Sequence, residues 1–387
     1  MITKIINAVL ITDVLLKGHA LYFEDGRITA ITQEDLPYDR LIDGKGLYLA
    51  PGFIDIHTHG AGGFDFADGT KEDILQAAAA HAAHGTTTLF PTATATAREK
   101  ILSFIRNVKE AMGENAPGKP HIAGSHLEGP YFSMAQRGAQ DPRYIRNPDP
   151  AEYEEWIAAG EGSLRRMSFA PELPGAEELC NTLRQKGIIA AYGHTDAIYQ
   201  EIKPLIEKGC QLATHLYSGM NTVTRRDLFR KLGGVETAFL EKEVTAEIIA
   251  DGLHLPPELL LMIYQIKGAD KLCLVTDSMR GAGMGEGPSV LGPKDNGVDC
   301  IIKDGIAYLT DMSSFCGSIA TADRLVRVMH KKAGVPLPDC IKMMCATPAK
   351  VMDLPDRGRL APGCYADLVL FDENIAIKKV IIEGKEI

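Results

Sequence analysis

The feature that most constrains the fold is a recurring unit: a short apolar run that ends in polar residues and leads into a helix-like stretch. The runs are FIDIHTH, TTTLFPT, HIAGSHLEG, RMSFAPE, GIIAAYGHT, CQLATHLY, VTAEIIADGLH and KLCLVTD. Stretches such as KEDILQAAAAHAAHG and DAIYQEIKPLIEKG lie between them and end in glycine, as helices often do. About eight units over nearly 300 residues predict a (β/α)8 barrel. A doubly wound open sheet is the alternative, but no Gly-rich dinucleotide loop follows a first strand.

Both ends of the chain have a different texture. The segments TKIINAVLIT, HALYFEDGRITAI and RLIDGKGLYLAPG are typical of short strands joined by turns, and ADLVLFDENIAIKKVIIEGKEI repeats the pattern at the C-terminus. We therefore expect residues 1–50 and 357–387 to form one small β domain, with the barrel over residues 51–356.

Charge and cysteine content exclude some classes of protein. A net charge of −10 argues against a general nucleic-acid or anionic-membrane binder, although a small anionic substrate needs only a local basic pocket. The N-terminus lacks the apolar core of a signal peptide, and no run is long enough to span a membrane. The eight cysteines are scattered without a CxxC pair, which is typical of reduced thiols in the cytoplasm.

Many of the apolar runs end in a residue that can bind a metal. These residues are His57, His59, Glu128, His194, His215 and Asp277. In a barrel the C-terminal ends of the strands converge on one mouth, where active sites are found. Imidazole and carboxylate ligands suit Zn²⁺, Fe²⁺ or Mn²⁺, so the sequence predicts a metal centre at that mouth.

The other histidines have simpler interpretations. Helical or loop positions favour structural roles for His81, His84, His121 and His330, whereas His126 is open to either role. Asp277 alone could cap the turn that follows it. Its place after LCLV, opposite the histidines, favours a catalytic role instead.

This set of residues indicates hydrolysis. A divalent metal lowers the pKa of a bound water to about 7. A nearby carboxylate can accept the proton of that water and later donate it to a leaving amine. We therefore expect cleavage of an amide, an ester or a ring C–N bond, with Asp277 as the acid/base.

Several motifs together resemble one family. They are PGFIDIHTHG, HLEGPY, YGHTDA, THLYSGMN, IIADGLH, LVTDSM and ATPAKVMDLPDRGRLAPGCYADLVLFD. This set is similar to the N-acetylglucosamine-6-phosphate deacetylases of the amidohydrolase superfamily, nearly end to end. The resemblance implies a barrel with a β-sandwich built from both termini, a homodimer, and a role in amino-sugar metabolism.

The resemblance also implies roles at the metal centre. Glu128, His194 and His215 would hold the main metal, and Asp277 would be the acid/base. Family members with two histidines in the first motif can hold a second metal, so His57 and His59 are expected ligands, with Glu128 bridging. The chain would then bind one or two divalent ions, Zn²⁺ or Fe²⁺. Many superfamily relatives bridge with a lysine from the fourth strand, but RMSFAPE contains none.

Substrate contacts follow from the same resemblance. The implied residues are Ala139, Gln140, Ser218, Gly219, Arg226, Asp251, His254, Phe315, Cys316 and Gly317. His254 would lie near the sugar phosphate, and Arg226 would reach the phosphate in a neighbouring subunit, since its planar fork suits phosphate. A solvated basic loop is the alternative for TRRDLFRK. The chain departs from the family at Gln140, where a histidine is usual, and in the loop after THLY.

These features support a deacetylase of N-acetylglucosamine 6-phosphate, with the galactosamine isomer as the next candidate. Gln140 and the altered loop leave room for another N-acyl or cyclic amide substrate. A catalytically silent scaffold is a further class, but such proteins usually lose ligands, and here every ligand position is filled.

Overall fold

The computed structural model describes all 387 residues and contains a parallel eight-stranded barrel. The strands follow the order β8–β11–β13–β14–β15–β16–β19–β20, and every one lies within a predicted run or overlaps it. They are β8 (Phe53–Thr58), β11 (Thr86–Ala93), β13 (Ser125–Glu128), β14 (Leu164–Phe169), β15 (Ile189–Tyr192), β16 (Leu212–Ala213), β19 (Thr245–Ile248) and β20 (Leu272–Leu274). The predicted barrel fold is confirmed.

The barrel closes where its last strand meets its first. The backbone N–H of Asp277 donates to the carbonyl of His57 at 2.9 Å, and the N–H of His59 donates to the carbonyl of Ser278 at 2.8 Å. Closure therefore brings two predicted metal-site segments into direct backbone contact.

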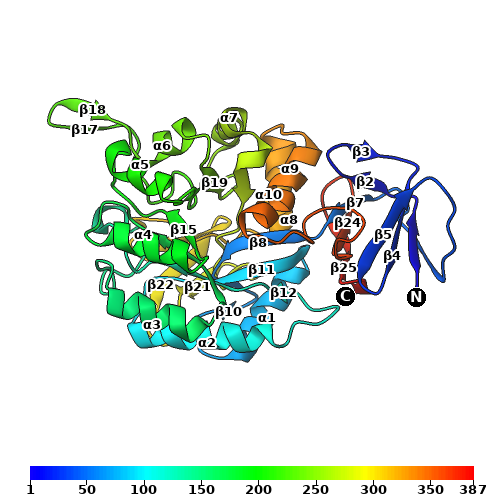
Figure 1. The fold of residues 1–387 in the computed structure, drawn as a ribbon, viewed down its shortest axis with the longest axis horizontal. Helices are drawn as coiled ribbons and strands as arrows, with labels where there is room; N and C mark the ends of the chain where they lie inside the picture. Colours follow the sequence, from blue (N-terminus) through cyan, green and yellow to red (C-terminus); the bar gives the residue numbers. More distant parts are fainter.

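Helices surround the barrel (Figure 1). They are α1 (Lys71–Ala82), α2 (Arg98–Met112), α3 (Pro150–Gly160), α4 (Ala176–Gln185), α5 (Tyr199–Glu207), α6 (Gly234–Leu240), α7 (Pro257–Lys267), α8 (Ala322–Arg327), α9 (Leu337–Met344) and α10 (Ala346–Val351). The side chain of Thr70 caps α1 by accepting the N–H of Asp73, and Asp149 caps α3 in the same way. None of the helices is long and apolar enough to cross a membrane.

Two further sheets lie at one end of the molecule, one built from N-terminal strands alone and the other from strands of both termini (Figure 1). The six-stranded sheet has the order β26–β25–β24–β7–β2–β3, and the four-stranded sheet has the order β5–β4–β1–β6. Their strands are β1 (Thr3–Ile6), β2 (Val9–Ile11), β3 (Leu15–Leu16), β4 (Ala20–Glu24), β5 (Arg27–Thr32), β6 (Arg40–Asp43), β7 (Tyr48–Pro51), β24 (Leu368–Phe371), β25 (Ile377–Ile382) and β26 (Lys385–Glu386). Leu10, Phe23 and Leu368 belong to the apolar core that these sheets share, so the β-sandwich built from both termini is confirmed.

Several smaller elements decorate the barrel. The sequence did not predict the three-stranded sheet of β21 (Gly287–Leu291), β22 (Val298–Lys303) and β23 (Ile306–Leu309), nor the hairpin of β17 (Thr224–Arg226) and β18 (Phe229–Lys231). The hairpin projects from the body of the molecule (Figure 1). The remaining short elements are β9 (Gly60–Ala61), β10 (Phe64–Asp65), β12 (His121–Ile122), and the turns of 3₁₀ or π helix at Met134–Gln136, Ala269–Lys271 and Val328–Lys332.

Candidate active site

Five strands deliver buried polar side chains to one end of the barrel. They are His57 and His59 at the end of β8, Glu128 at the end of β13, and His194, His215 and Asp277 shortly after β15, β16 and β20. Side chains alternate between the two faces of a strand, so His57 and His59 point the same way. All six predicted metal-site residues therefore lie together.

Three of these residues have an unusual backbone conformation. The φ angles of His194, His215 and Asp277 are 44°, 25° and 46°, in the left-handed region that favours glycine. Such conformations cost about 1–3 kcal/mol each and persist where the surrounding structure imposes them, often at functional sites. Each of the three residues turns the chain immediately after a barrel strand, which aims its side chain across the mouth.

The carboxylate of Glu128 lies at the centre of the group. Its Oε1 is 2.7 Å from His215 Nε2, 3.1 Å from His194 Nε2 and 3.6 Å from His57 Nε2. Its Oε2 is 3.3 Å from His59 Nε2. The donors form two groups that share Glu128, one with His57 and His59 and the other with His194 and His215, and the atoms of each group lie within 4.8 Å of one another. This arrangement matches a bridging carboxylate.

The donor set fits divalent cations. His57 Nε2 is buried without a hydrogen-bond partner and faces Glu128 and Asp277. An unpaired buried polar atom is costly, and a cation in the shared space would satisfy it. Burial opposes the charge on Glu128, but His57, His194 and His215 outweigh this effect and hold the pKa of its carboxyl well below the usual range.

Asp277 lies beside this set. Its Oδ1 is 3.0 Å from His59 Nε2 and 3.4 Å from His57 Nε2. Burial disfavours its charged form, yet His57 and His59 keep the pKa of Asp277 below its ordinary value. The carboxylate is therefore ionised and able to accept a proton.

A cavity of about 320 Å³ opens above these residues. Seven of the ten predicted substrate contacts line it: Ala139, Gln140, Ser218, Gly219, His254, Phe315 and Gly317. Asp251 lies behind His254, with its Oδ2 2.8 Å from His254 Nδ1. Cys316 is fully buried in a small apolar cluster. Arg226 lies outside the cavity and donates to the carbonyl of Asp196 at 2.6 Å.

Gln140 connects the cavity to the metal set. Its Oε1 accepts the backbone N–H of Ala95 at 2.7 Å, and its Nε2 donates to Glu128 Oε2 at 2.6 Å. The bond to Ala95 fixes which end of the amide faces Glu128. The residue that departs from the resembled family thus contacts the central carboxylate directly.

The sequence profile of the amidohydrolase family matches residues 48–387. The chain belongs to the amidohydrolase family. It is 31% identical over 370 residues to N-acetylglucosamine-6-phosphate deacetylase of Lysinibacillus sphaericus, covering 94% of this chain and 92% of the relative. It is 29% identical over 372 residues to N-acetylgalactosamine-6-phosphate deacetylase of Escherichia coli O157:H7, covering 96% and 95%.

Solved structures agree with this relationship. A mutant N-acetyl-D-glucosamine-6-phosphate deacetylase of Mycobacterium smegmatis, in complex with N-acetyl-D-glucosamine-6-phosphate, superimposes on this amidohydrolase with a TM-score of 0.91. The two chains are 32% identical, and the match covers 100% of this chain and 98% of the other.

The remaining histidines of this amidohydrolase lie outside the metal set. His126 is buried with both ring nitrogens occupied, Nδ1 by Thr92 Oγ1 at 3.2 Å and Nε2 by Ser168 Oγ at 2.8 Å. His81 bonds Thr58 Oγ1 at 2.9 Å. Neither belongs to a group of candidate metal donors. His126, which the sequence left open, is structural.

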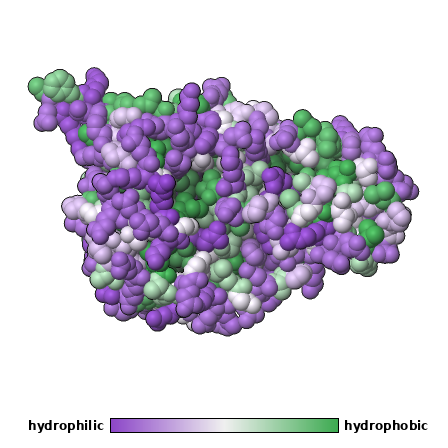
Figure 2. Space-filling model, in the orientation of Figure 1, coloured by the Kyte–Doolittle hydropathy of each residue, from purple (hydrophilic) through white to green (hydrophobic).

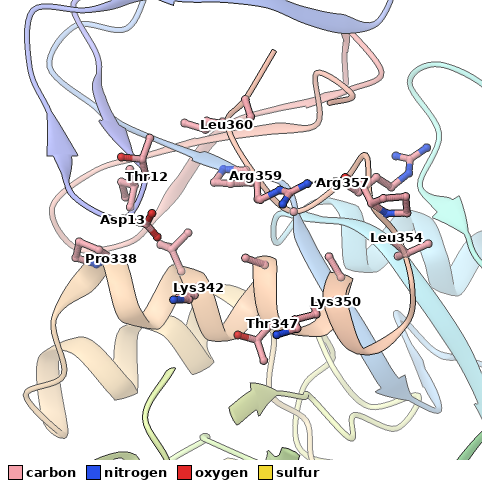
Figure 3. Close-up of a pocket in the computed structure, with 18 of the residues that line it drawn as sticks. Thr12, Asp13, Pro338, Lys342, Thr347, Lys350, Leu354, Arg357, Arg359 and Leu360 are labelled. Carbon is pink, nitrogen blue, oxygen red and sulfur yellow. Dashed lines mark hydrogen bonds between the residues drawn. The ribbon is translucent and has the colours of Figure 1, made fainter. Parts of the chain in front are cut away.

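A larger cavity of this amidohydrolase lies elsewhere. It measures about 590 Å³ and is formed by the terminal β region together with α9, α10 and the chain that follows them (Figure 3). Its walls contain no histidine. Lys342 pairs with Asp270, and Arg357 with Asp367, so several of its charges are already neutralised. No converging set of donors marks it as a reactive site.

Sequence reasoning missed two charged residues beneath the metal set. Arg166 on β14 and Glu247 on β19 are fully buried and bonded to each other, and Glu247 Oε2 lies 3.2 Å from His57 Nδ1. The available signal was a lone charge inside each apolar run, RMSF and TAEII. Charged residues are almost never fully buried unless they are paired.

Proposed function

We propose that this amidohydrolase removes the acetyl group of N-acetylglucosamine 6-phosphate, releasing acetate and glucosamine 6-phosphate in amino-sugar catabolism. The observation that carries the proposal is the shared carboxylate of Glu128, which joins two groups of buried donors with Asp277 beside them. Relatives and solved structures with this activity in their names, matched over most of the chain, support the substrate.

The site residues divide the chemistry among them. When bound, a divalent cation such as Zn²⁺ or Fe²⁺ would polarise the amide carbonyl and lower the pKa of water to about 7. We assign Glu128, His194 and His215 to the main ion, and His57 and His59, with Glu128, to a second one.

Asp277 moves the proton. Its carboxylate accepts a proton from water as the water oxygen attacks the carbonyl carbon. The same carboxyl group donates this proton to the amine nitrogen as the C–N bond breaks. Acetate and the free amine are the products.

His254 is the proposed phosphate contact within the chain. His254 Nδ1 donates to Asp251 Oδ2 at 2.8 Å, and in the imidazolium form Nε2 donates as well and can bond a phosphate oxygen. The ring of Phe315 lies edge-on at 4.9 Å between centroids and restricts the imidazole further. Ser218 and Gly219 line the same cavity and offer backbone groups to the sugar.

The cavity contains no lysine or arginine, although the proposed substrate carries a phosphate dianion. We infer that the protein is a homodimer in which the projecting hairpin of one copy supplies this cation to the other. Arg226, the expected residue, bonds Glu201 at 3.2 Å in its own chain. Arg225 and Arg230 lie opposite each other across the hairpin and are both exposed, which leaves them able to bind an anion.

The tip of the hairpin is apolar. Leu228 is 83% exposed and Phe229 is 71% exposed, and Figure 2 shows the apolar tip standing clear of the body. Burying these side chains against a second copy supports the dimer. The eight free cysteines, all buried, support a reducing cytoplasmic location.

The galactosamine isomer is the second candidate substrate, since relatives at similar identity carry that name. Acetate release from both phosphorylated epimers and from unphosphorylated N-acetylglucosamine tests the proposal. We expect one phosphorylated sugar to be preferred strongly. No release from any of them, with metal bound, would move the substrate to another N-acyl or cyclic amide.

Asp277→Asn tests the proton transfer. The amide cannot accept the proton, so we expect turnover to fall by a factor of about 10²–10⁴ while fold and metal content are retained. Turnover close to that of the wild type would refute the role of Asp277.

A further inference from the structure

A buried ion pair crosses the interior of the barrel beneath His57. Arg166 and Glu247 lie on β14 and β19, which are separated by β15 and β16 in the barrel, and both side chains are 0% exposed. Arg166 Nη1 donates to Glu247 Oε1 and, at 3.2 Å, to the carbonyl of Ile56. The two oxygens of Glu247 have separate partners, because Oε2 lies 3.2 Å from His57 Nδ1 and accepts the backbone N–H of His215 at 3.3 Å.

Stability does not explain this pair. Removing two charges from water costs several kcal/mol per ion, and apolar residues of similar volume are often as stable or more so. The pair is fully enclosed, so solvent does not reduce this cost. Its placement directly behind a candidate metal ligand suggests a role in the site instead.

We propose that Arg166 and Glu247 are positioning residues that hold His57 in the tautomer with hydrogen on Nδ1. The lone pair of Nε2 then faces the space shared with Glu128 and Asp277, where His57 Nε2 is 3.6 Å and 3.4 Å from their nearest oxygens. This inference rests on the metal centre of the proposed function. It makes the orientation of one ligand of that centre depend on two residues that do not bind the metal themselves.

The two histidines of the first motif differ in this respect. His59 Nδ1 is buried without any hydrogen-bond partner, whereas His57 Nδ1 has Glu247. His57 is therefore the ligand whose orientation is fixed in advance. Hydrogen bonds behind a metal ligand typically change metal affinity by about 10–100-fold when they are removed.

The substitution Glu247→Gln separates the two duties of this carboxylate. Glutamine has one acceptor oxygen and one NH₂ group, while Arg166 can only donate. The charged guanidinium of Arg166 attracts the amide oxygen more strongly than the neutral backbone N–H of His215 does, so the NH₂ group turns towards His57. The Nδ1 of His57 must then accept, which moves its hydrogen to Nε2 and closes the position that faces the metal.

A second substitution reverses this effect. In Arg166→Met combined with Glu247→Gln, nothing competes for the amide oxygen, which can face His57 Nδ1 again. The double variant also leaves no unpaired charge in the interior. Glu241→Gln is the matched control, because Glu241 is a buried carboxylate that pairs with Lys203 and makes no contact with His57.

The experiment has two readouts. Histidine-selective ¹⁵N labelling of the Zn²⁺-loaded proteins shows which ring nitrogen of His57 carries hydrogen, assigned by its loss in His57→Asn. Titration of the metal-free proteins with Zn²⁺ against a chromophoric chelator gives the affinity of each equivalent. We expect the Nδ1–H tautomer in the wild type, Nε2–H in Glu247→Gln with one equivalent weakened about 10–100-fold, and recovery in the double variant.

Unchanged tautomer and affinity in Glu247→Gln, with circular dichroism showing an intact fold, would overturn the proposal. So would a double variant no better than the single one. Failure of the proposed function is distinguishable, because it appears as a metal-loaded wild type that releases no acetate while the tautomer and affinity results stand.

Discussion

Gln140 makes two hydrogen bonds that one substitution removes together and another preserves. Its oxygen satisfies the buried N–H of Ala95, and its NH₂ group donates to Glu128 at 2.6 Å. In Gln140→Leu both bonds are lost. In Gln140→His both can be kept, because a neutral imidazole offers one acceptor and one donor. The two variants therefore form a matched pair.

The magnitudes follow from the two bonds. Leaving the N–H of Ala95 unpaired costs about 1–3 kcal/mol of stability. With an unfolding entropy of about 2.1 cal/mol/K per residue, the 387-residue chain should lose on the order of 1–4 °C in Tm. A hydrogen bond to a charged carboxylate contributes about 1.5–3 kcal/mol, so its loss should lower kcat/KM by about 10–150-fold.

Differential scanning calorimetry and an acetate-release assay measure these two effects on the same preparations. Gln140→Leu should lose both Tm and kcat/KM, whereas Gln140→His should keep most of each. A Gln140→Leu enzyme within about threefold of the wild type in kcat/KM would refute the link between Gln140 and Glu128, since 1.5 kcal/mol already corresponds to about tenfold. Equal losses in both variants would refute the donor–acceptor reasoning.

Three further predictions test other parts of the molecule. Removal of metal with dipicolinate should abolish acetate release without changing the far-UV circular dichroism spectrum, and added Zn²⁺ should restore acetate release. Activity in the metal-free protein would contradict the metal centre. Burial, aided by Arg357, lowers the pKa of His121 from 6.5 to about 4, so the folded chain stays neutral there while the unfolded chain binds a proton. The contribution of His121 to the free energy of unfolding is therefore complete above pH 6.5 and falls by up to about 3 kcal/mol as the pH is lowered towards 4. His121→Gln should make Tm fall less steeply over this pH range, whereas the control His19→Gln should not. The double variant Leu228→Ser and Phe229→Ser should elute as a monomer in size-exclusion chromatography with light scattering, and it should bind the phosphorylated sugar more weakly. A dimer as stable as that of the wild type would exclude the hairpin as the interface.

The barrel and the grouping of the candidate metal donors were predictable because both depend on local pattern. Each of the eight runs yielded a strand, and the strand ends delivered the donors to one mouth. The partnership of Arg166 and Glu247 was not predictable, because a lone charge in an apolar run does not reveal which distant strand carries its partner. The inward turn of Arg226 depends on the register of its hairpin, which a short polar segment specifies weakly.

Closure of the barrel and completion of the site are one structural event. The same backbone bond that joins the last strand to the first, from Asp277 N–H to the carbonyl of His57, sets the proposed acid/base 3.4 Å from a proposed ligand. A barrel left open at this seam would still contain Glu128, His194 and His215 on neighbouring strands, but Asp277 would not be held beside the histidines of the first motif. A partly folded form could therefore bind the main metal ion and still be inactive. Bound metal alone would not show that the enzyme is functional, because acetate release also requires the closed barrel.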